Sequence, residues 1–502
     1  MKPRFSWHDI IAGVSVALVL IPQALAYADV AGLPGQHGLW AAAAAPIAAA
    51  LFASSPFLQT GPVAVTSLLT LGALVQLAPA GSPRYVALAA LLALLVGVVR
   101  LTIGLFQVGW ISYLMSQPVI LGFMSAASVL IAASQVPGLV GVPKGGAGVL
   151  ADAVTALSSP ATWSREALVL GAASIAVIVG LRRWWPRIPG VLVVAAGALV
   201  YSRTMEFQGP VTGSITAGLP HLSLRLPWSA VPALLLPGLV IALVGFADAA
   251  AIARTYATRD RQSWDPDREF IGQGFANVAS GLVGGFAVGG SFARSSLGRL
   301  AGARSRWAGF VTGLTVLAFL PFADMLRAMP SAALAAIVIT ATWSLIDVKA
   351  IARVTRLSVS QGVVALTTFA TTLLFAPRID LAVLLGIATS LAVHAYRELR
   401  LVPNLRIDGD VIEVAPQGVL WFASAPFLEP ELLWALSQYE GAKVLRVDLK
   451  GLGRIDLSGA LALRRILDDA RDAGLVTELV GVPVHAERWV RKVLSPDGGE
   501  EP

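Results

Sequence analysis

The sequence predicts a helical, multi-pass membrane protein that ends in a small α/β domain. Its 502 residues are 56% hydrophobic and only 13% charged, with a mean hydropathy of +0.73. Soluble domains carry about 25% charged residues. Apolar runs of about 20 residues, the length that crosses a bilayer, recur as far as residue 400. Beyond residue 400, short strand-like and helix-like segments alternate, which is typical of an α/β unit.

Fourteen apolar segments in the first 400 residues are candidate membrane spans. The first follows Ile10 and runs into Pro22 without a small-residue cleavage site, so we expect a span and not a signal peptide. The expected spans lie near residues 10–28, 38–54, 63–77, 85–107, 114–135, 166–182, 188–203, 231–252, 269–284, 292–302, 305–322, 331–346, 358–376 and 378–396. Residues 1–400 hold 26 Lys and Arg against 14 Asp and Glu. Most of these cations fall in alternate loops, so the positive-inside rule explains the excess better than nucleic-acid binding. The rule places both termini in the cytoplasm, and the membrane itself is expected to be a bacterial-type inner membrane.

The two halves of this region have similar hydropathy patterns. Long first and eighth spans are each followed, two spans later, by a short span that begins after a glycine break. The breaks are Gly61–Ser67 and Gly289–Ser296. Seven spans in each half would give the halves opposite orientations, which is the pattern of an inverted repeat whose broken helices meet near the midplane. The N-terminal N–H groups of such half-helices bind anions. We therefore expect an anion site between the two breaks.

Two charged residues lie close to this expected site. Arg294 directly follows the second break, where it would add positive charge at the anion site. The alternatives are an arginine that snorkels to the interface or a partner of Asp248. Asp248 lies well inside the eighth span, and an acid at membrane depth is either a helix-end packing residue or a proton or cation site. Its neighbours Ala249 and Ala250 offer no oxygen ligands for sodium, which favours proton coupling.

Polar residues also occur in the first span. Gln23 and Tyr27 follow Pro22 at i, i+4 spacing, so they share one helix face, either as part of a binding notch or as ordinary polar packing. The chain has no cysteine, and its five histidines lack metal-ligand spacing. The glycines of 281–290 lack the strand, turn and helix of a dinucleotide site. We therefore expect no metal, no cofactor, no nucleic-acid partner and no enzymatic activity.

Residues 401–502 are expected to form a cytoplasmic domain. Strands are expected at Val411–Val414, Gly418–Phe422, Lys443–Leu449 and Val476–Val480. Helices are expected at Phe427–Gln438, Gly459–Ala473 and Ala486–Leu494.

Several motifs along the chain together resemble the sulfate permease (SulP) family of anion transporters. In the membrane region they are Ile21–Ala28 with Ala31–Pro34, Gly61–Thr66, Asp267–Asn277, Phe292–Ser296 and Ala301–Arg304. In the C-terminal region, Val447–Leu449 and Ile455–Gly459 resemble a STAS domain. In the related anti-anti-sigma factors a serine at the position of Ser458 is phosphorylated, but a serine there is also an ordinary helix cap.

The resemblance implies a seven-plus-seven inverted repeat with a uracil-transporter-like fold. Spans 1–4 and 8–11 would form a core domain that moves substrate past a gate domain of spans 5–7 and 12–14, followed by the STAS domain from residue 401. The half-helices at spans 3 and 10 would face each other. The implied substrate pocket consists of Gln23, Tyr27, Ala64, Val65, Thr66, Phe292, Ala293 and Arg294, and the family's span-8 acid corresponds to Asp248.

Family members carry sulfate, bicarbonate, chloride, nitrate or dicarboxylates. Where the family often has Glu-Ser in span 8, this chain has Asp248-Ala249, and a hydroxyl often found before the arginine is replaced by Ala293. Backbone N–H groups are therefore expected to do more of the anion binding. We expect proton-coupled symport of a carboxylate, dicarboxylate or related oxyanion by a homodimer. The alternatives are an uncoupled facilitator or channel, sodium-coupled bicarbonate or sulfate transport, and a membrane-tethered interaction module.

Overall fold

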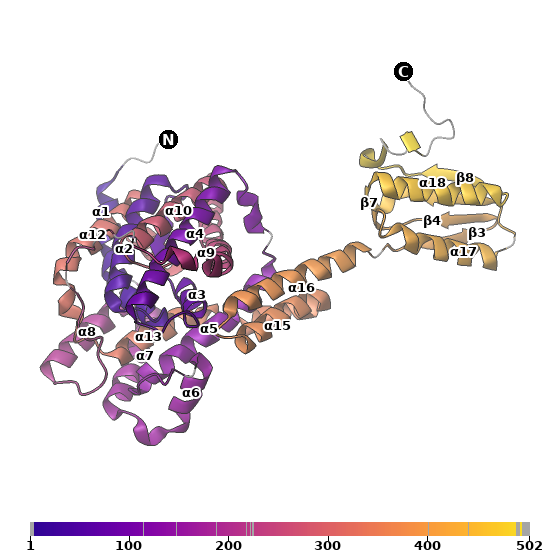
Figure 1. Cartoon of the computed structure of the whole chain (residues 1–502). Coiled ribbons are helices and arrows are strands. Elements are labelled where there is room, and N and C mark those ends of the chain that lie inside the picture. Colours follow the sequence, from indigo (N-terminus) through magenta and orange to yellow (C-terminus); the bar gives the residue numbers. More distant parts are fainter. Residues whose placement is uncertain are drawn as a thin grey trace. The chain divides into compact units, whose positions relative to one another are not determined.

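The chain divides into two compact units, residues 1–389 and 390–502, and the boundary falls within α16 (Ile379–Leu399) (Figure 1). The computed structural model describes residues 5–113, 115–146, 148–186, 188–216, 218–220, 222, 225–399, 401–439, 441–487 and 492–493.

Helices cover all fourteen expected spans of the first unit. In the first half they are α1 (Trp7–Val30), α2 (Gly35–Phe52), α3 (Ala64–Leu74), α4 (Pro83–Leu105), α5 (Gln117–Val140), α7 (Arg165–Trp184) and α8 (Gly190–Thr204). In the second half they are α9 (Val231–Arg259), α10 (Pro266–Leu282), α11 (Phe292–Leu300), α12 (Trp307–Phe319), α13 (Ser331–Thr342), α15 (Val359–Leu374) and α16. Within the described residues, eight helical segments are long and apolar enough to cross a membrane. The total of fourteen crossings stays a prediction.

Two helices of the first unit were not expected from the sequence. They are α6 (Val149–Ser158), which buries only Ala153 and Ala156, and α14 (Val348–Leu357), which buries only Ile351. Neither helix has an apolar run of spanning length. A search for spans therefore passes over both of them.

A short two-stranded sheet joins the two halves of the first unit. Strand β1 (Gln59–Gly61) precedes α3, and β2 (Gly289–Ser291) precedes α11. The strands pair antiparallel, with Gln59 opposite Ser291 and Gly61 opposite Gly289. The order helix, helix, strand, short helix thus occurs twice, and the pairing brings the N-termini of α3 and α11 together. Gly290 permits this approach, because a Cβ there would lie 2.8 Å from Leu58 Cδ1 and 3.1 Å from the Cα of Ala249.

Glycines also bring α4 and α10 close together. A Cβ on Gly97 would lie 2.7 Å from the backbone nitrogen of Val278, and one on Gly274 would lie 2.9 Å from the backbone nitrogen of Leu101. Helices in a membrane gain little from burying apolar surface against each other, so close packing through small residues takes that role. The pair therefore forms a tight support for the β2 segment that follows α10.

Two buried acids fix loops next to this framework. Asp9, in the first turn of α1, accepts hydrogen bonds from the backbone nitrogens of Arg304 (2.8 Å) and Ser305 (2.9 Å). Glu269, in the first turn of α10, accepts one from the backbone nitrogen of Ser55 (2.7 Å). Each carboxylate also lies at the positive end of its own helix dipole. Each acid therefore ties one half of the chain to a loop of the other half.

The second unit is an α/β domain. Strands β3 (Leu405–Asp408), β4 (Val411–Val414), β6 (Val444–Asp448) and β8 (Val476–Val480) form one sheet in the order β3-β4-β6-β8, and β5 (Gly418–Leu420) pairs with β7 (Leu452–Ile455). Helices α17 (Leu428–Gln438) and α18 (Leu457–Asp472) complete it. Ile412 and Leu445 of the sheet and Leu463 and Leu467 of α18 belong to one buried core.

The second unit differs from the sequence expectations in two strands and in the cap of α18. Strands β3 and β7 were not expected, because the side chains of β3 are mostly exposed and β7 contains a glycine. The helix expected at Ala486–Leu494 falls largely outside the described residues. Ser458 is not the cap of α18, because the N-cap is Asp456, whose carboxylate accepts a hydrogen bond from the backbone nitrogen of Gly459 at 2.7 Å. Ser458 lies exposed in the first turn.

Candidate functional site

The N-termini of α3 and α11 meet where β1 and β2 end. The N-cap of α3 is Val63, which has no side-chain oxygen to cap the helix. The backbone N–H groups of Ala64 and Val65 therefore have no hydrogen-bond partner among the described residues. In α11 the first turn is capped only by Ser291, whose hydroxyl lies 3.4 Å from the backbone nitrogen of Arg294. Two helix dipoles thus present their positive ends at one place.

Arg294 lies at this meeting point and is 1% exposed. Its Nη1 donates to Oε1 of Gln23 at 3.4 Å, whereas Nε and Nη2 have no partner among the described residues. Nη2 would lie 3.4 Å from a Cβ at Gly61, so the guanidinium lies directly beside the end of β1. A buried guanidinium with unpaired donors is costly. Such a group is usually kept because it binds something.

The first helix supplies the other polar wall. Gln23 and Tyr27 are buried, with 4% and 5% exposure, and lie one turn apart on α1. Pro22 does not break this helix, which continues from Trp7 to Val30. Gln23 therefore contacts Arg294 from a continuous helix, and the role of Gln23 and Tyr27 in anion binding stays a prediction.

Three expected pocket residues differ in how they face the site. The hydroxyl of Thr66 donates back to the carbonyl of Val63 at 3.2 Å, so it is engaged within its own helix turn. Ala293 is exposed. Phe292 is 53% exposed, and its ring stacks on that of Tyr256 with centroids 6.3 Å apart. Any contact of these residues with a bound anion stays a prediction.

Asp248 lies on α9 beside the same framework. Its neighbour Ala249 contacts the Gly290 position of β2, and Gly245 one turn earlier faces Thr66. Asp248 is half-buried and makes no hydrogen bond or ion pair with another described residue. Among these residues, no ion pair joins Asp248 to Arg294, so the structure does not support the alternative in which the two residues pair.

Sequence reasoning missed a second buried arginine behind the site. Arg100 of α4 is fully buried and donates to the carbonyls of Ala242 (3.1 Å), Ile241 (3.2 Å) and Val288 (3.0 Å). Asn277 of α10 also pairs with both backbone groups of Val288. These bonds hold the segment before β2 against α9. The rule that singled out Arg294, a lone charge at membrane depth, applies equally to Arg100.

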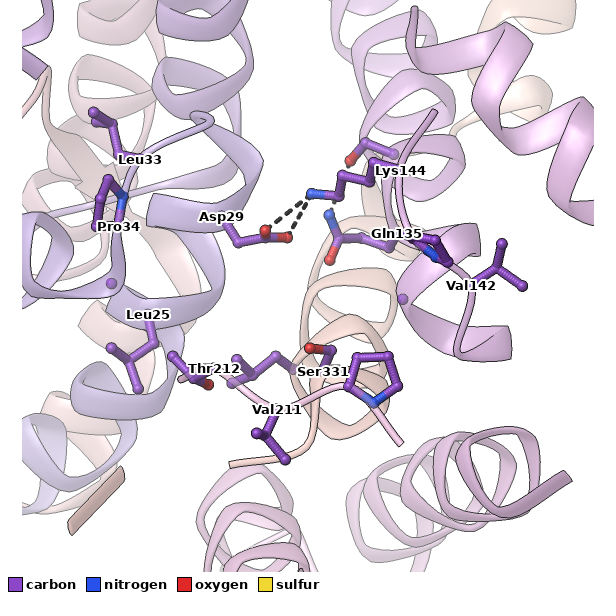
Figure 2. Close-up of a pocket in the computed structure, with 16 residues that line it drawn as sticks. Leu25, Asp29, Leu33, Pro34, Gln135, Val142, Lys144, Val211, Thr212 and Ser331 are labelled. Carbon is purple, nitrogen blue, oxygen red and sulfur yellow. Dashed lines mark hydrogen bonds and ion pairs between the residues drawn. The ribbon is translucent and has the colours of Figure 1, made fainter. Parts of the chain in front are cut away.

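A separate cavity of about 420 Å³ opens beside the end of α1 (Figure 2). It contains none of the expected site residues. Its lining includes Leu25, Asp29, Leu33, Gln135 and Lys144. Across it, Lys144 Nζ lies 2.9 and 2.8 Å from the two carboxylate oxygens of Asp29. Elsewhere in the described part of the chain, no cluster of three His, Asp or Glu residues could hold a metal ion.

The family models agree with this architecture. Residues 7–368 match the sulfate permease family, and residues 402–493 match the STAS domain. The chain belongs to the sulfate permease family. This confirms the assignment made from the motifs, and it makes the protein a multi-pass membrane transporter of anions with a STAS domain, a domain that is typically cytoplasmic.

Named relatives support the same conclusion. A probable sulfate transporter of Mycobacterium tuberculosis is 34% identical over 407 residues, which covers 80% of this chain and 71% of the relative. A sodium-independent sulfate anion transporter of Bos taurus is 28% identical, over 99% of this chain and 87% of the relative.

Solved structures show the same fold at low identity. The murine Slc26a9 anion transporter in its inward-facing state matches with a TM-score of 0.88 at 20% identity, over 98% of this chain and 88% of that one. The transmembrane domain of the cyanobacterial bicarbonate transporter BicA matches with a TM-score of 0.65 at 23% identity, over 76% of this chain and 97% of that one.

Proposed function

We propose that this protein is a proton-coupled secondary transporter of a small oxyanion, which binds between the N-termini of α3 and α11. The observation that carries the proposal is the free edge of Arg294. Nε and Nη2 lie on the same side of a guanidinium, and together they form the fork that pairs with two oxygens of one anion. Here both atoms are buried and have no partner among the described residues.

The backbone adds to this binding. Uncapped N–H groups at the start of α3 and the dipole of α11 would replace part of the hydration of the anion. Gln23 would hold the third guanidinium nitrogen, Nη1, so that the free edge keeps its direction. Tyr27 would line the anion site on the side of α1, while Phe292 and Ala293, which are exposed, would line its entrance.

The same geometry supports an oxyanion as the substrate. A carboxylate or two oxygens of sulfate fit a guanidinium fork, whereas chloride offers no second oxygen. The named relatives are sulfate transporters. We propose sulfate and a small dicarboxylate as the two candidate substrates, each carried by a core of spans 1–4 and 8–11 that moves against a gate of spans 5–7 and 12–14 in a homodimer.

Asp248 would carry the coupled proton. Its sequence neighbours Ala247, Ala249 and Ala250 offer no side-chain oxygen, whereas sodium requires several oxygen ligands. A protonated Asp248 would not repel a nearby anion, so binding of proton and anion would favour each other.

Uptake into proteoliposomes tests the proposal. Labelled sulfate, bicarbonate and fumarate are each offered with and without an inward proton gradient, and with and without sodium. We expect sulfate or fumarate to accumulate only with the proton gradient. We expect Asp248→Asn to abolish that accumulation and to keep downhill exchange. Accumulation that follows sodium, or downhill equilibration of every anion, would overturn proton coupling.

A further inference from the structure

The cavity beside α1 lies between two walls from different parts of the membrane unit, and it is completed by residues 210–212 and by Ser331 and Leu334 of α13. One wall is the end of α1 with Leu33 and Pro34, and the other is α5 with the loop that follows it (Figure 2). Among the described lining residues, the ion pair between Asp29 and Lys144 is the polar contact that joins these two walls. The two residues are separated by 115 positions in the sequence.

This ion pair contributes little to the folded state. The side chains are 53% and 44% exposed, and exposed pairs are screened by water and salt. Asp29 also lies in the last turn of α1, where a carboxylate opposes the helix dipole. Lys144 is followed by Gly145 and Gly146, so its loop has few side chains to hold it. Neither residue is therefore placed to stabilise its own element.

A weak contact between two walls is suited to repeated breaking. We propose that Asp29 and Lys144 form a latch that parts and re-forms as α1 moves relative to α5 during transport. The proposal rests on the proposed function, in which span 1 belongs to the core and span 5 to the gate. The closed latch favours the arrangement seen here, and an open latch favours the opposite one.

Distance measurements test the latch without any substrate. The chain contains no cysteine, so spin labels on Gln36→Cys and Pro143→Cys report only the separation of the two walls. We expect Asp29→Lys or Lys144→Asp to lower the ratio of short to long distances about two- to fivefold, the range for one exposed ion pair. The double reversal should restore the wild-type ratio.

A matched control uses another exposed pair. Asp324 lies in the short 3-10 helix Leu320–Leu326, 3.5 Å from Arg327, which follows this helix, and the two side chains are 52% and 66% exposed. Arg327→Asp creates the same like-charge contact without bridging two walls, and we expect it to leave the distances unchanged. Unchanged distances in both single reversals, or a double reversal that fails to restore the ratio, would overturn the latch.

Cross-linking links the latch to transport. In Asp29→Cys/Lys144→Cys, a bis-methanethiosulfonate with a bridge about as long as a lysine side chain should stop uptake, and a reductant should restore it. Continued uptake by fully cross-linked protein would refute the latch proposal and leave the proposed function intact. If the wild type accumulates none of the three anions while charge reversal still shifts the distances, the proposed function fails and the latch stands.

Discussion

Replacing Arg294 by lysine separates the charge of this residue from its shape. Lysine keeps a positive charge but lacks the planar fork. A hydrogen bond to a charged group contributes about 1.5–3 kcal/mol. Losing one of the two bonds from the Nε and Nη2 edge should therefore weaken anion binding about 10- to 100-fold.

The assay is thermal unfolding of purified protein at increasing concentrations of sulfate and of fumarate. At 100 times its Kd, a ligand stabilises the wild type by about 2.7 kcal/mol. A variant that binds 30-fold more weakly gains only about 0.9 kcal/mol at the same concentration. Arg294→Met should show no anion response and a higher melting temperature without anion, because it removes a buried charge with unpaired donors.

Arg299→Lys is the matched control on the same helix. Arg299 pairs with Asp260 at 2.8 Å and is 36% exposed, so its substitution should leave the anion response unchanged. The reasoning is refuted if Arg294→Lys responds to anion as the wild type does, or if Arg294→Met lowers the melting temperature without anion.

Three further substitutions test the framework around the site. In Gly290→Val, the new Cβ would lie 3.1 Å from the Cα of Ala249, and the two methyl groups have no room. We expect this to displace β2 and to abolish the anion-dependent stabilisation. An unchanged response would contradict the tight packing of β2 against α9. Arg100→Met removes three hydrogen bonds from a charged group to carbonyls, each worth about 1.5–3 kcal/mol, so we expect a large drop in melting temperature, with Arg100→Lys intermediate. Asp456→Ala removes the cap of α18 and should destabilise the C-terminal unit by about 0.5–2 kcal/mol, measured by hydrogen exchange in the full chain, whereas Ser458→Ala should change nothing.

The parts of the site that depend on local pattern were predictable from the sequence. Glycine breaks at Gly61 and Gly289 interrupt apolar runs, and both mark the starts of short helices in the structure. The motif around Phe292–Ser296 also put Arg294 at the meeting point. Each of these signals is contained within a few consecutive residues, so local sequence alone is enough to recognise it.

The parts that depend on contacts between distant segments were not predictable. Gln23 contacts one nitrogen of Arg294 and leaves the opposite edge without a partner among the described residues, and nothing in the sequence sets which nitrogen remains free. Arg100 binds carbonyl groups, which every residue carries, so its partners leave no signature. The latch between Asp29 and Lys144 likewise joins two surface charges that look like ordinary loop residues.

The pairing of β1 with β2 has a consequence for biosynthesis. Gly61 meets a partner that is synthesised more than 200 residues later. At about 5–20 residues per second, the ribosome needs roughly 10–50 s to deliver Gly289 after Gly61. During that interval α3 already exists with its uncapped N-terminus, while α11, Arg294 and the second strand do not. The site therefore cannot assemble until the second half of the chain has been made, and any error that misplaces β2 leaves the N-terminus of α3 without its partner.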